Sequence, residues 1–273
     1  MIGIIIQARM GSTRLQGKVM KEVLGRPLLE LLIERLKNCQ LVDEIVVATT
    51  TKAADDVIEA LARKLSVKVM RGSEDDVLDR YFQAAKKFAL DHIVRITADC
   101  PLSDPEIVDK MIKYYIDSYF KYDYLCNTIK PTFPDGMDVE IFSFEVLEKI
   151  HRLSQKKYLR EHVCGYIIEN PDQFRIKNYA NDNDLSAIRL TVDTPEDFEL
   201  IRVIFERLYP SKGIFHFDDI LELIRENPEL SKMNSRDGRN EGFLLSLEKE
   251  GYDEAERAAI KKIIVDKEKI YGI

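Results

Sequence analysis

Residues 2–18 read IGIIIQARMGSTRLQGK, and the fold prediction for the whole chain starts from them. Ile2–Gln7 is a continuous apolar run of strand length, as found in strands that are buried on both faces of a sheet. A loop with two glycines follows at once and carries three cations, Arg9, Arg14 and Lys18. Because glycine lets backbone N–H groups curl around an anion and cations neutralise its charge, this loop predicts a polyphosphate site at the end of a buried strand.

The spacing of the loop differs from the common phosphate-binding motifs. Gly11 and Gly17 give G-x-x-x-x-x-G-K, one residue longer than a Walker A loop, and Val19 stands where that loop carries Ser or Thr for magnesium. The sequence also contains no G-x-G-x-x-G motif of the dinucleotide-binding kind. From the residues alone, a triphosphate site and an ordinary solvated basic loop both stay open.

The first 100 residues alternate apolar runs with helical patterns. The runs of strand length are Ile2–Gln7, Glu44–Thr49, Val67–Met70 and His92–Thr97. Apolar residues at helical spacing lie between them, in Pro27–Asn38, Ala54–Leu65 and Asp76–Leu90. Such alternation is typical of right-handed crossovers between parallel strands. The sequence therefore predicts an α/β fold of three layers, α/β/α, around a mainly parallel central sheet.

The second half of the chain has a different pattern. Residues 122–140 hold Tyr, Pro and Gly between β-rich ends, which predicts a loop or a hairpin insertion. Helices are predicted at Phe144–Leu153, Tyr158–Glu169, Thr194–Leu208 and Phe217–Glu226, and strands at Phe174–Asn178 and Ile188–Val192. From Asn234 the chain is polar and then charged, with a helix predicted over Glu248–Lys269. We therefore expect one domain, residues 1–232, and a C-terminal helical appendage, residues 233–273.

The composition excludes several classes of protein. The chain has 273 residues, 41 Lys and Arg against 48 Asp and Glu, and a net charge of −7, which argues against a nucleic-acid binder. No apolar stretch approaches the about 18 residues of a membrane span, and the start lacks the pattern of a signal peptide. The four cysteines form no C-x-x-C pair, which disfavours a zinc site and suits a reducing cytoplasm.

Two aspartates stand at the ends of predicted strands. Asp99 lies in TADCP and Asp193 in TVDTPED. In an open α/β sheet, ligands bind outside the carboxyl ends of the strands, and paired carboxylates there suit a hard cation such as Mg²⁺. Each aspartate can instead cap the helix that follows it, the use that we expect for Asp104 before Pro105. Together with the basic loop, the pair favours a metal site.

Six segments in a fixed order give the sequence a family resemblance over residues 2–208. They are IIIQARMGSTRLQGKVM (4–20), RGSEDDVLDRY (71–81), RITADCPLSDPEIVD (95–109), FPDGMDVEIFSFEVLE (133–148), REHVCGYIIENP (160–171) and RLTVDTPEDFELI (189–201). This order resembles the sugar-acid cytidylyltransferases, which include the 3-deoxy-manno-octulosonate and acylneuraminate cytidylyltransferases and the spore-coat polysaccharide cytidylyltransferase-like proteins. The resemblance implies a nucleotidyltransferase fold with a hairpin insertion.

The resemblance and the residue types together predict the members of the site. The nucleotide-binding residues are Arg9, Gly11, Ser12, Arg14, Lys18, Thr49, Arg71, Gly72, Asp75 and Arg80, of which Lys18 and Arg9 join Asp99 as catalytic residues. The matching aspartates of the family hold magnesium, which implies the same for Asp99 and Asp193. The acceptor-binding residues are Asp138, Glu140, Arg160 and His162.

Several of these residues have a second interpretation. Asp75 can cap the following helix, Thr49 can be an ordinary strand residue, and His162 can be an interior histidine. The chain also departs from the family pattern at two places. Gln16 stands where the family usually has Pro, and Cys164–Gly165 where it usually has Thr-Pro, which leaves the geometry on the acceptor side open.

The predicted function is that of an enzyme, a magnesium-dependent cytidylyltransferase. It would transfer CMP from CTP to a sugar acid or related hydroxylated acceptor in surface polysaccharide biosynthesis, releasing pyrophosphate. Family likeness implies a homodimer, with residues 122–141 as the contact. Two alternatives are a nucleotide-sugar glycosyltransferase, which would use Asp182 and Asp184 as a D-x-D motif although such a loop is usually a turn, and a non-catalytic nucleotide-binding module.

Overall fold

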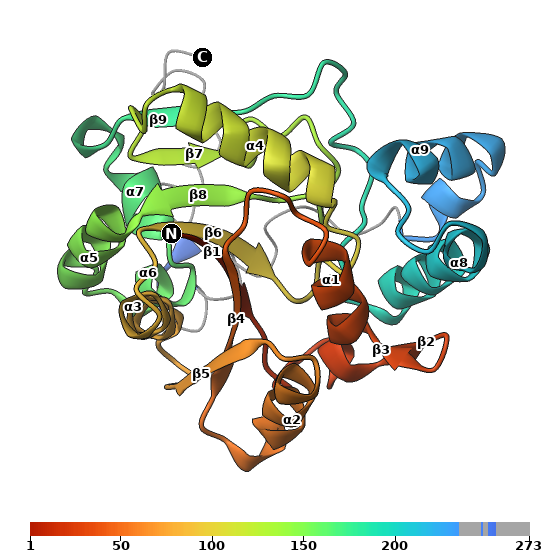
Figure 1. Cartoon of the computed structure of the whole chain (residues 1–273), viewed down its shortest axis with the longest axis horizontal. Helices are drawn as coiled ribbons and strands as arrows, with labels where there is room; N and C mark the ends of the chain where they lie inside the picture. The colour runs from red at the N-terminus through yellow and green to blue at the C-terminus, as the bar shows by residue number, and fades with distance from the viewer. Residues whose placement is uncertain (235–246, 248–250, 255–273) are drawn as a thin grey trace.

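Seven strands form one central sheet in the order β5-β4-β1-β6-β8-β7-β9 (Figure 1). The computed structural model describes residues 1–234, 247 and 251–254. The sheet strands are β1 (Ile2–Gln7), β4 (Glu44–Thr50), β5 (Lys68–Gly72), β6 (His92–Thr97), β7 (Tyr124–Cys126), β8 (Glu140–Ser143) and β9 (Ile176–Asn178). A separate ribbon pairs β2 (Glu22–Val23) with β3 (Arg26–Pro27).

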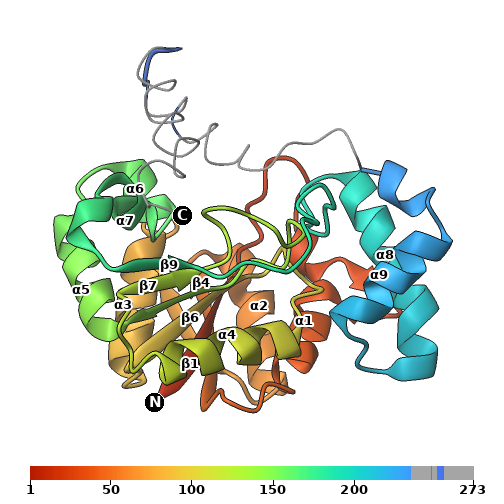
Figure 2. The same cartoon turned by 90° about the horizontal axis from the view of Figure 1, so that it is seen from above.

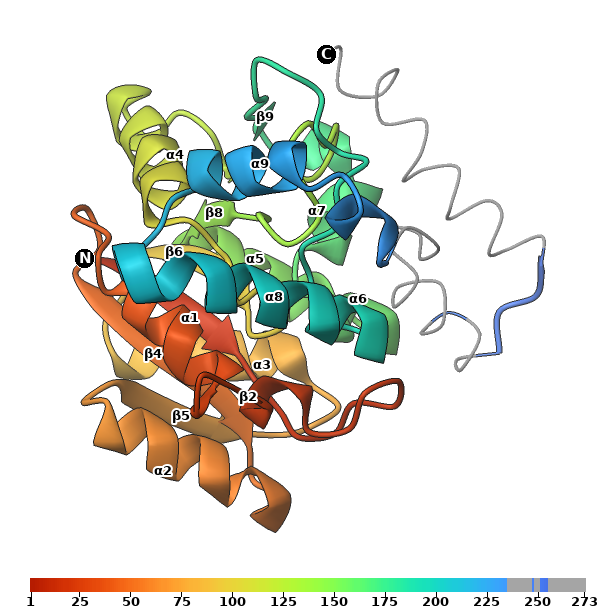
Figure 3. The same cartoon turned by 90° about the vertical axis from the view of Figure 1, so that its right-hand side faces the viewer.

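Helices cover both faces of the sheet and complete the predicted three layers. They are α1 (Leu28–Leu36), α2 (Asp56–Lys64), α3 (Val77–Lys87), α4 (Pro105–Asp117), α5 (Phe144–Leu153), α6 (Lys157–Glu161), α7 (Gly165–Glu169), α8 (Pro195–Lys212) and α9 (Phe217–Glu226). One face packs against α1, α2 and α4, and the other against α3, α5 and α7. Figure 3 shows α8 and α9 side by side next to α1.

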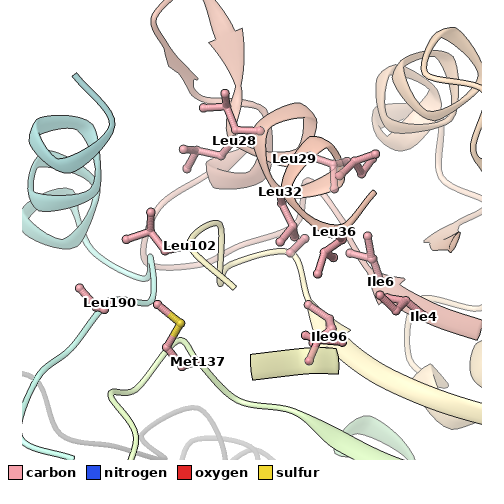
Figure 4. Close-up of a cluster of buried hydrophobic side chains, with 14 of the residues drawn as sticks. Ile4, Ile6, Leu28, Leu29, Leu32, Leu36, Ile96, Leu102, Met137 and Leu190 are labelled. Carbon is pink, nitrogen blue, oxygen red and sulfur yellow. The ribbon is translucent and has the colours of Figure 1, made fainter. Parts of the chain in front are cut away.

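Strand β1 lies at the centre of the core, because its apolar side chains pack on both faces of the sheet. Side chains alternate across a strand, so Ile4 and Ile6 point to one face and Ile5 to the other. Figure 4 shows Ile4 and Ile6 packed against the apolar side of α1. β1 pairs in parallel with β4 and β6, as the alternation of strands and helices predicted.

The hairpin predicted over 122–140 is confirmed, and its two strands belong to the central sheet. β7 and β8 pair antiparallel, and β8 also pairs antiparallel with β6. β7 is buried at all three positions, and β8 is buried at Glu140, Ile141 and Phe142. The half of the sheet beyond β6 is therefore mixed, since β9 runs parallel to β7.

The prediction of a strand at Ile188–Val192 was wrong. In this segment a single isolated bridge, between Arg189 and Asp135, takes the place of a paired strand. Leu190 and Val192 are buried as in a strand, but their backbone N–H groups donate to loop carbonyls instead of a neighbouring strand. Gly136 allows the close approach, because it has a φ of +102° and a Cβ there would lie 2.5 Å from the carbonyl carbon of Leu190.

Local capping decides where helices begin. Asp76, and not Asp75, caps α3 by accepting a 2.8 Å hydrogen bond from the Asp79 backbone N–H. The cap predicted at Asp104 is confirmed by its bonds to the Glu106 and Ile107 backbone N–H groups. The helix predicted over 158–169 is broken into α6 and α7, because Val163 adopts a φ of +57° that a helix cannot hold.

Part of the predicted appendage, 233–273, lies outside the described residues, as does most of its predicted helix at 248–269. Of the residues that are described, Leu247 packs on Tyr158 and Leu159 of α6, and Tyr252 lies edge-on to Tyr158. The division at residue 232 stays a prediction. No helix within the described part of the chain has the length and apolarity that crossing a membrane requires.

Candidate active site

A cavity of about 230 Å³ opens at the carboxyl ends of β1 and β6. Figure 2 shows the loop after β1 and helices α6 and α7 at this same end of the sheet. The lining residues are Gln7, Ala8, Arg9, Gly11, Ser12, Thr13, Arg14, Lys18, Val19, Val77, Arg80, Thr97, Ala98, Asp99, Glu161, His162 and Asp193. The structure thus brings the predicted basic loop and both predicted aspartates into one pocket.

The loop after β1 is held in shape by its own backbone and by one buried carboxylate. The Ser12 and Gly17 backbone N–H groups donate to the Met10 carbonyl, and Gly17 adopts a φ of +65°. The Met10 backbone N–H donates a 2.7 Å hydrogen bond to Asp55, whose other oxygen accepts from the Thr50 hydroxyl. Asp55 was not predicted as a site residue, because its sequence position only indicated the start of a helix.

Lys18 lies between the two aspartates. Its ammonium donates 2.8 Å hydrogen bonds to Asp99 Oδ2 and to Asp193 Oδ1, and a third to the Val192 carbonyl. Burial alone would lower the pKa of Lys18, but the charges of the aspartates outweigh it and raise that pKa above its usual value. Burial alone would likewise raise the pKa of Asp99, but Lys18 lowers it to about 2. Lys18 and Asp99 are therefore both charged at neutral pH.

The other oxygen of Asp193 also faces cations. Its Oδ2 lies 2.9 Å from Arg14 and 2.9 Å from Arg189, which also binds Asp135 at 2.8 Å. Sequence reasoning missed Arg189, since a charged residue in an apolar run gives no sign of its distant partners. The result is a network of alternating charges that joins the basic loop to the segment before α8.

Arg80, Glu161 and His162 also line the pocket. Arg80 is 2% exposed, and its guanidinium donates to the carbonyls of Ser73 and Glu74. Gly72 makes room for it, because a Cβ there would lie 2.9 Å from Arg80 Cγ. Burial and the nearby Arg9 lower the pKa of Arg80.

His162 is the acceptor-side residue that the pocket includes. Burial, together with Arg95 and Arg9, lowers its pKa to about 3, so the ring is neutral. Glu161 was not predicted; it lies 3.7 Å from Arg9 with its side chain 40% exposed. The sequence signal for Glu161 was its position between Arg160 and His162, which were both predicted.

Seven predicted site residues lie outside the pocket lining, and three of them have clear structural partners. Arg71 faces α2, where it pairs with Asp56 and Glu59. Glu140 accepts from Arg95 and Tyr124, and Arg160 binds Asp76 of α3 at 2.6 Å. The remaining four are Thr49, which is buried, Asp75, which is exposed, and Gly72 and Asp138. The pocket gives no support to direct ligand contacts by these residues.

The D-x-D pattern does not face the pocket either. Asp182 and Asp184 are exposed, and Asp184 accepts from the Ser186 backbone N–H as in an ordinary turn. This placement removes the support for a glycosyltransferase site at these residues.

The pair of aspartates has the chemistry that a divalent metal needs. No group of three or more His, Cys, Asp or Glu side chains among the described residues is arranged to hold a metal by itself. Magnesium, however, commonly binds through one or two carboxylates and keeps its other positions for water and phosphate oxygens. The Lys18 ammonium already lies between oxygens of Asp99 and Asp193, which shows that the pair can surround a cation.

Comparison with known proteins identifies the family. The family model described as “Cytidylyltransferase” matches residues 3–227. An uncharacterised protein of Methanocaldococcus jannaschii is 41% identical over 235 residues, covering 85% of this chain and 93% of its own. The spore coat polysaccharide biosynthesis protein SpsF of Bacillus subtilis is 33% identical, covering 85% and 98%. A solved cytidylyltransferase from Leptospira borgpetersenii has a TM-score of 0.82 at 39% identity, covering 87% and 99%.

The chain belongs to the cytidylyltransferase family, and its fold is the nucleotidyltransferase fold. The predicted class of enzyme, a nucleotidyltransferase, is thereby confirmed.

Proposed function

We propose that this protein is a magnesium-dependent cytidylyltransferase that transfers CMP from CTP to a sugar acid or a related hydroxylated acceptor and releases pyrophosphate. The observation that supports this most directly is the position of Lys18 between Asp99 and Asp193, beside the glycine-containing loop, in a chain of this family. The cations that line the pocket also complement a triphosphate.

In the proposed reaction, an acceptor oxygen attacks the α-phosphorus of CTP, the bond from that phosphorus to the bridging oxygen breaks, and pyrophosphate leaves. Such a transfer depends on positioning and on charge neutralisation. Lys18 and Arg9 stabilise the charge on the phosphates, while Arg14, Ser12 and the backbone at Gly11 hold them in place.

Asp99 and Asp193 would hold Mg²⁺, which when bound supplies further charge neutralisation and can act as a Lewis acid toward the acceptor oxygen. Lys18, whose ammonium lies beside this pair, would donate to the phosphate oxygens.

The acceptor would bind at the wall formed by α6. His162 serves there as a neutral hydrogen-bonding group, because its lowered pKa keeps it uncharged. Glu161 would accept a hydrogen bond from an acceptor hydroxyl. Arg9 lies 3.7 Å from Glu161, so one side chain would be near both the acceptor and the phosphates.

Some parts of the proposal rest on likeness alone. The choice of cytosine rests on the family, and the role in surface polysaccharide rests on the similarity to the spore coat protein. The homodimer rests on the resemblance in sequence. Within the predicted contact at 122–141, β7 and the start of β8 lie inside the sheet. A cytoplasmic location stays a prediction; the four cysteines are free thiols.

The first test needs no acceptor. Thermal unfolding would be followed with Mg²⁺ and each of CTP, UTP, ATP and GTP. A ligand at 100 times its dissociation constant adds about 2.7 kcal/mol, which raises Tm by several degrees. We expect Tm to rise with Mg²⁺ and CTP but not with UTP, ATP or GTP. We expect the K18A variant to lose this rise. Pyrophosphate release would then be screened over sugar acids, and CTP binding without release from any of them would favour the binding module.

A further inference from the structure

Asn234 lies beyond residue 227, where the family match ends, yet its side chain reaches the charge network of the site. The side chain is buried, with an exposed fraction of 5% for the residue. Its amide nitrogen donates a 2.8 Å hydrogen bond to Asp197 Oδ1 and a 3.1 Å bond to the Arg189 carbonyl. Both N–H groups of the amide are therefore used on two residues of one network.

Asp197 connects this amide to the backbone of Asp193. The Asp197 side chain is fully buried in the first turn of α8. Its Oδ2 accepts from the backbone N–H groups of Asp193, at 2.9 Å, and Thr194, at 3.0 Å. The Asp197 carboxylate thus fixes the path of the chain at the residue whose own carboxylate enters the pocket.

Arg189 connects the same amide to the side chain of Asp193. Its guanidinium binds both oxygens of Asp197, at 3.0 and 3.1 Å, and Asp193 Oδ2 at 2.9 Å. Asn234 completes the hydrogen bonds of Asp197 Oδ1, the oxygen that Arg189 Nε also uses. Without the amide, Asp197 would be held through Oδ1 by Arg189 alone.

We infer that Asn234 is a positioning residue for Asp193, so that residues past the end of the family match contribute to the geometry of the metal site. This inference rests on the proposed function, because it concerns a site for a divalent cation and a nucleotide. When a residue that orients a metal ligand through hydrogen bonds is lost, metal affinity typically falls by about 10- to 100-fold.

The test measures metal affinity in the full chain. Mn²⁺ would be titrated in the presence of CTP and followed by electron paramagnetic resonance, for wild type, N234A, N234D and N227A. Asn227 is the matched control: its amide also donates to a carbonyl, that of Leu223 at 2.9 Å, and its side-chain oxygen accepts from Arg207, which lies outside the network at Asp193.

We expect N234A to weaken Mn²⁺ binding about tenfold. N234D should weaken it more, although its side chain is nearly the same shape, because a carboxylate would then face Asp197 and the Arg189 carbonyl. N227A should bind like wild type. N234S, whose smaller hydroxyl can donate only one of the two hydrogen bonds, replaces N234A if that variant does not fold, and should also weaken Mn²⁺ binding.

Three results would overturn the inference. Unchanged Mn²⁺ affinity in N234A and N234D, with only a lower Tm, would mean that the amide merely anchors the chain after α9. An equal loss in N227A would assign the effect to general destabilisation. Wild type that binds no Mn²⁺ with CTP would refute the proposed metal site itself, and the inference with it.

Discussion

Replacing Lys18 by Met should let a divalent metal bind in the absence of nucleotide. The Lys18 ammonium takes up the space between Asp99 and Asp193, 2.8 Å from an oxygen of each. A metal ion that enters between the two carboxylates must first displace it. In the wild type, we expect the triphosphate to draw Lys18 away, so that the metal and CTP bind together.

The size of the effect follows from the hydrogen bonds that Lys18 gives up. A hydrogen bond to a charged group contributes about 1.5–3 kcal/mol, and two of those bonds join Lys18 to carboxylates. At the lower end of this range, breaking both bonds reduces the free energy of metal binding by about 3 kcal/mol. This is roughly a hundredfold in affinity, because about 1.4 kcal/mol corresponds to tenfold. Mn²⁺ should therefore bind K18M about a hundredfold more tightly than wild type without CTP.

The assay is a Mn²⁺ titration without nucleotide, with R14M as the control. Arg14 carries the same charge and touches the Asp193 carboxylate at 2.9 Å, but it does not lie between the two aspartates. At the same lower end of the range, removal of its bond to Asp193 should strengthen binding about tenfold. Equal gains in both variants would show that net charge, and not the position of Lys18, controls the metal. If K18M bound no Mn²⁺ even with CTP, Asp99 and Asp193 would be excluded as ligands.

Three further predictions concern the site and the loop beside it. D99N should lose pyrophosphate release while keeping wild-type secondary structure by circular dichroism; a folded, active variant would remove Asp99 from the mechanism. Because Lys18 lowers the pKa of Asp99 to about 2, the stability from this pair is present above the usual Asp pKa and is lost as the pH falls through about 2. Urea unfolding between pH 4 and 2 should therefore depend less on pH in D99N than in wild type. G136A should lose about 3 kcal/mol in urea unfolding, from backbone strain and from overlap with Leu190, whereas G213A, with a φ of +64° and open space, should lose about 1 kcal/mol.

The parallel half of the sheet and the core of the site could be predicted from the sequence because their signals are local. The apolar run of β1 and the loop after it are adjacent in the chain, and Asp99 directly follows a strand that was also predicted. Once those strands are placed in parallel, their carboxyl ends must meet, and the contact of Lys18 with Asp99 follows from the topology.

The rest depends on contacts between distant parts of the chain. β8 enters the sheet antiparallel beside β6, which its short apolar sequence does not indicate. Arg71 was predicted at the nucleotide by resemblance, but in the structure it pairs with acidic residues of α2 and lies outside the pocket lining. Glu161 lines the pocket at the end of α6, just before Val163 breaks the helix, and nothing in a β-branched residue predicts a positive φ.

The bond between Asp55 and the backbone of Met10 bears on how tightly the protein can bind its ligand. A loop that becomes ordered only on binding loses conformational entropy at that moment, which weakens the affinity. Here the loop after β1 is tied to the end of β4 through Asp55 and Thr50 in the free protein. Folding has thus already met the entropic cost of ordering this loop, and under the proposed function a triphosphate would bind to a preorganised loop.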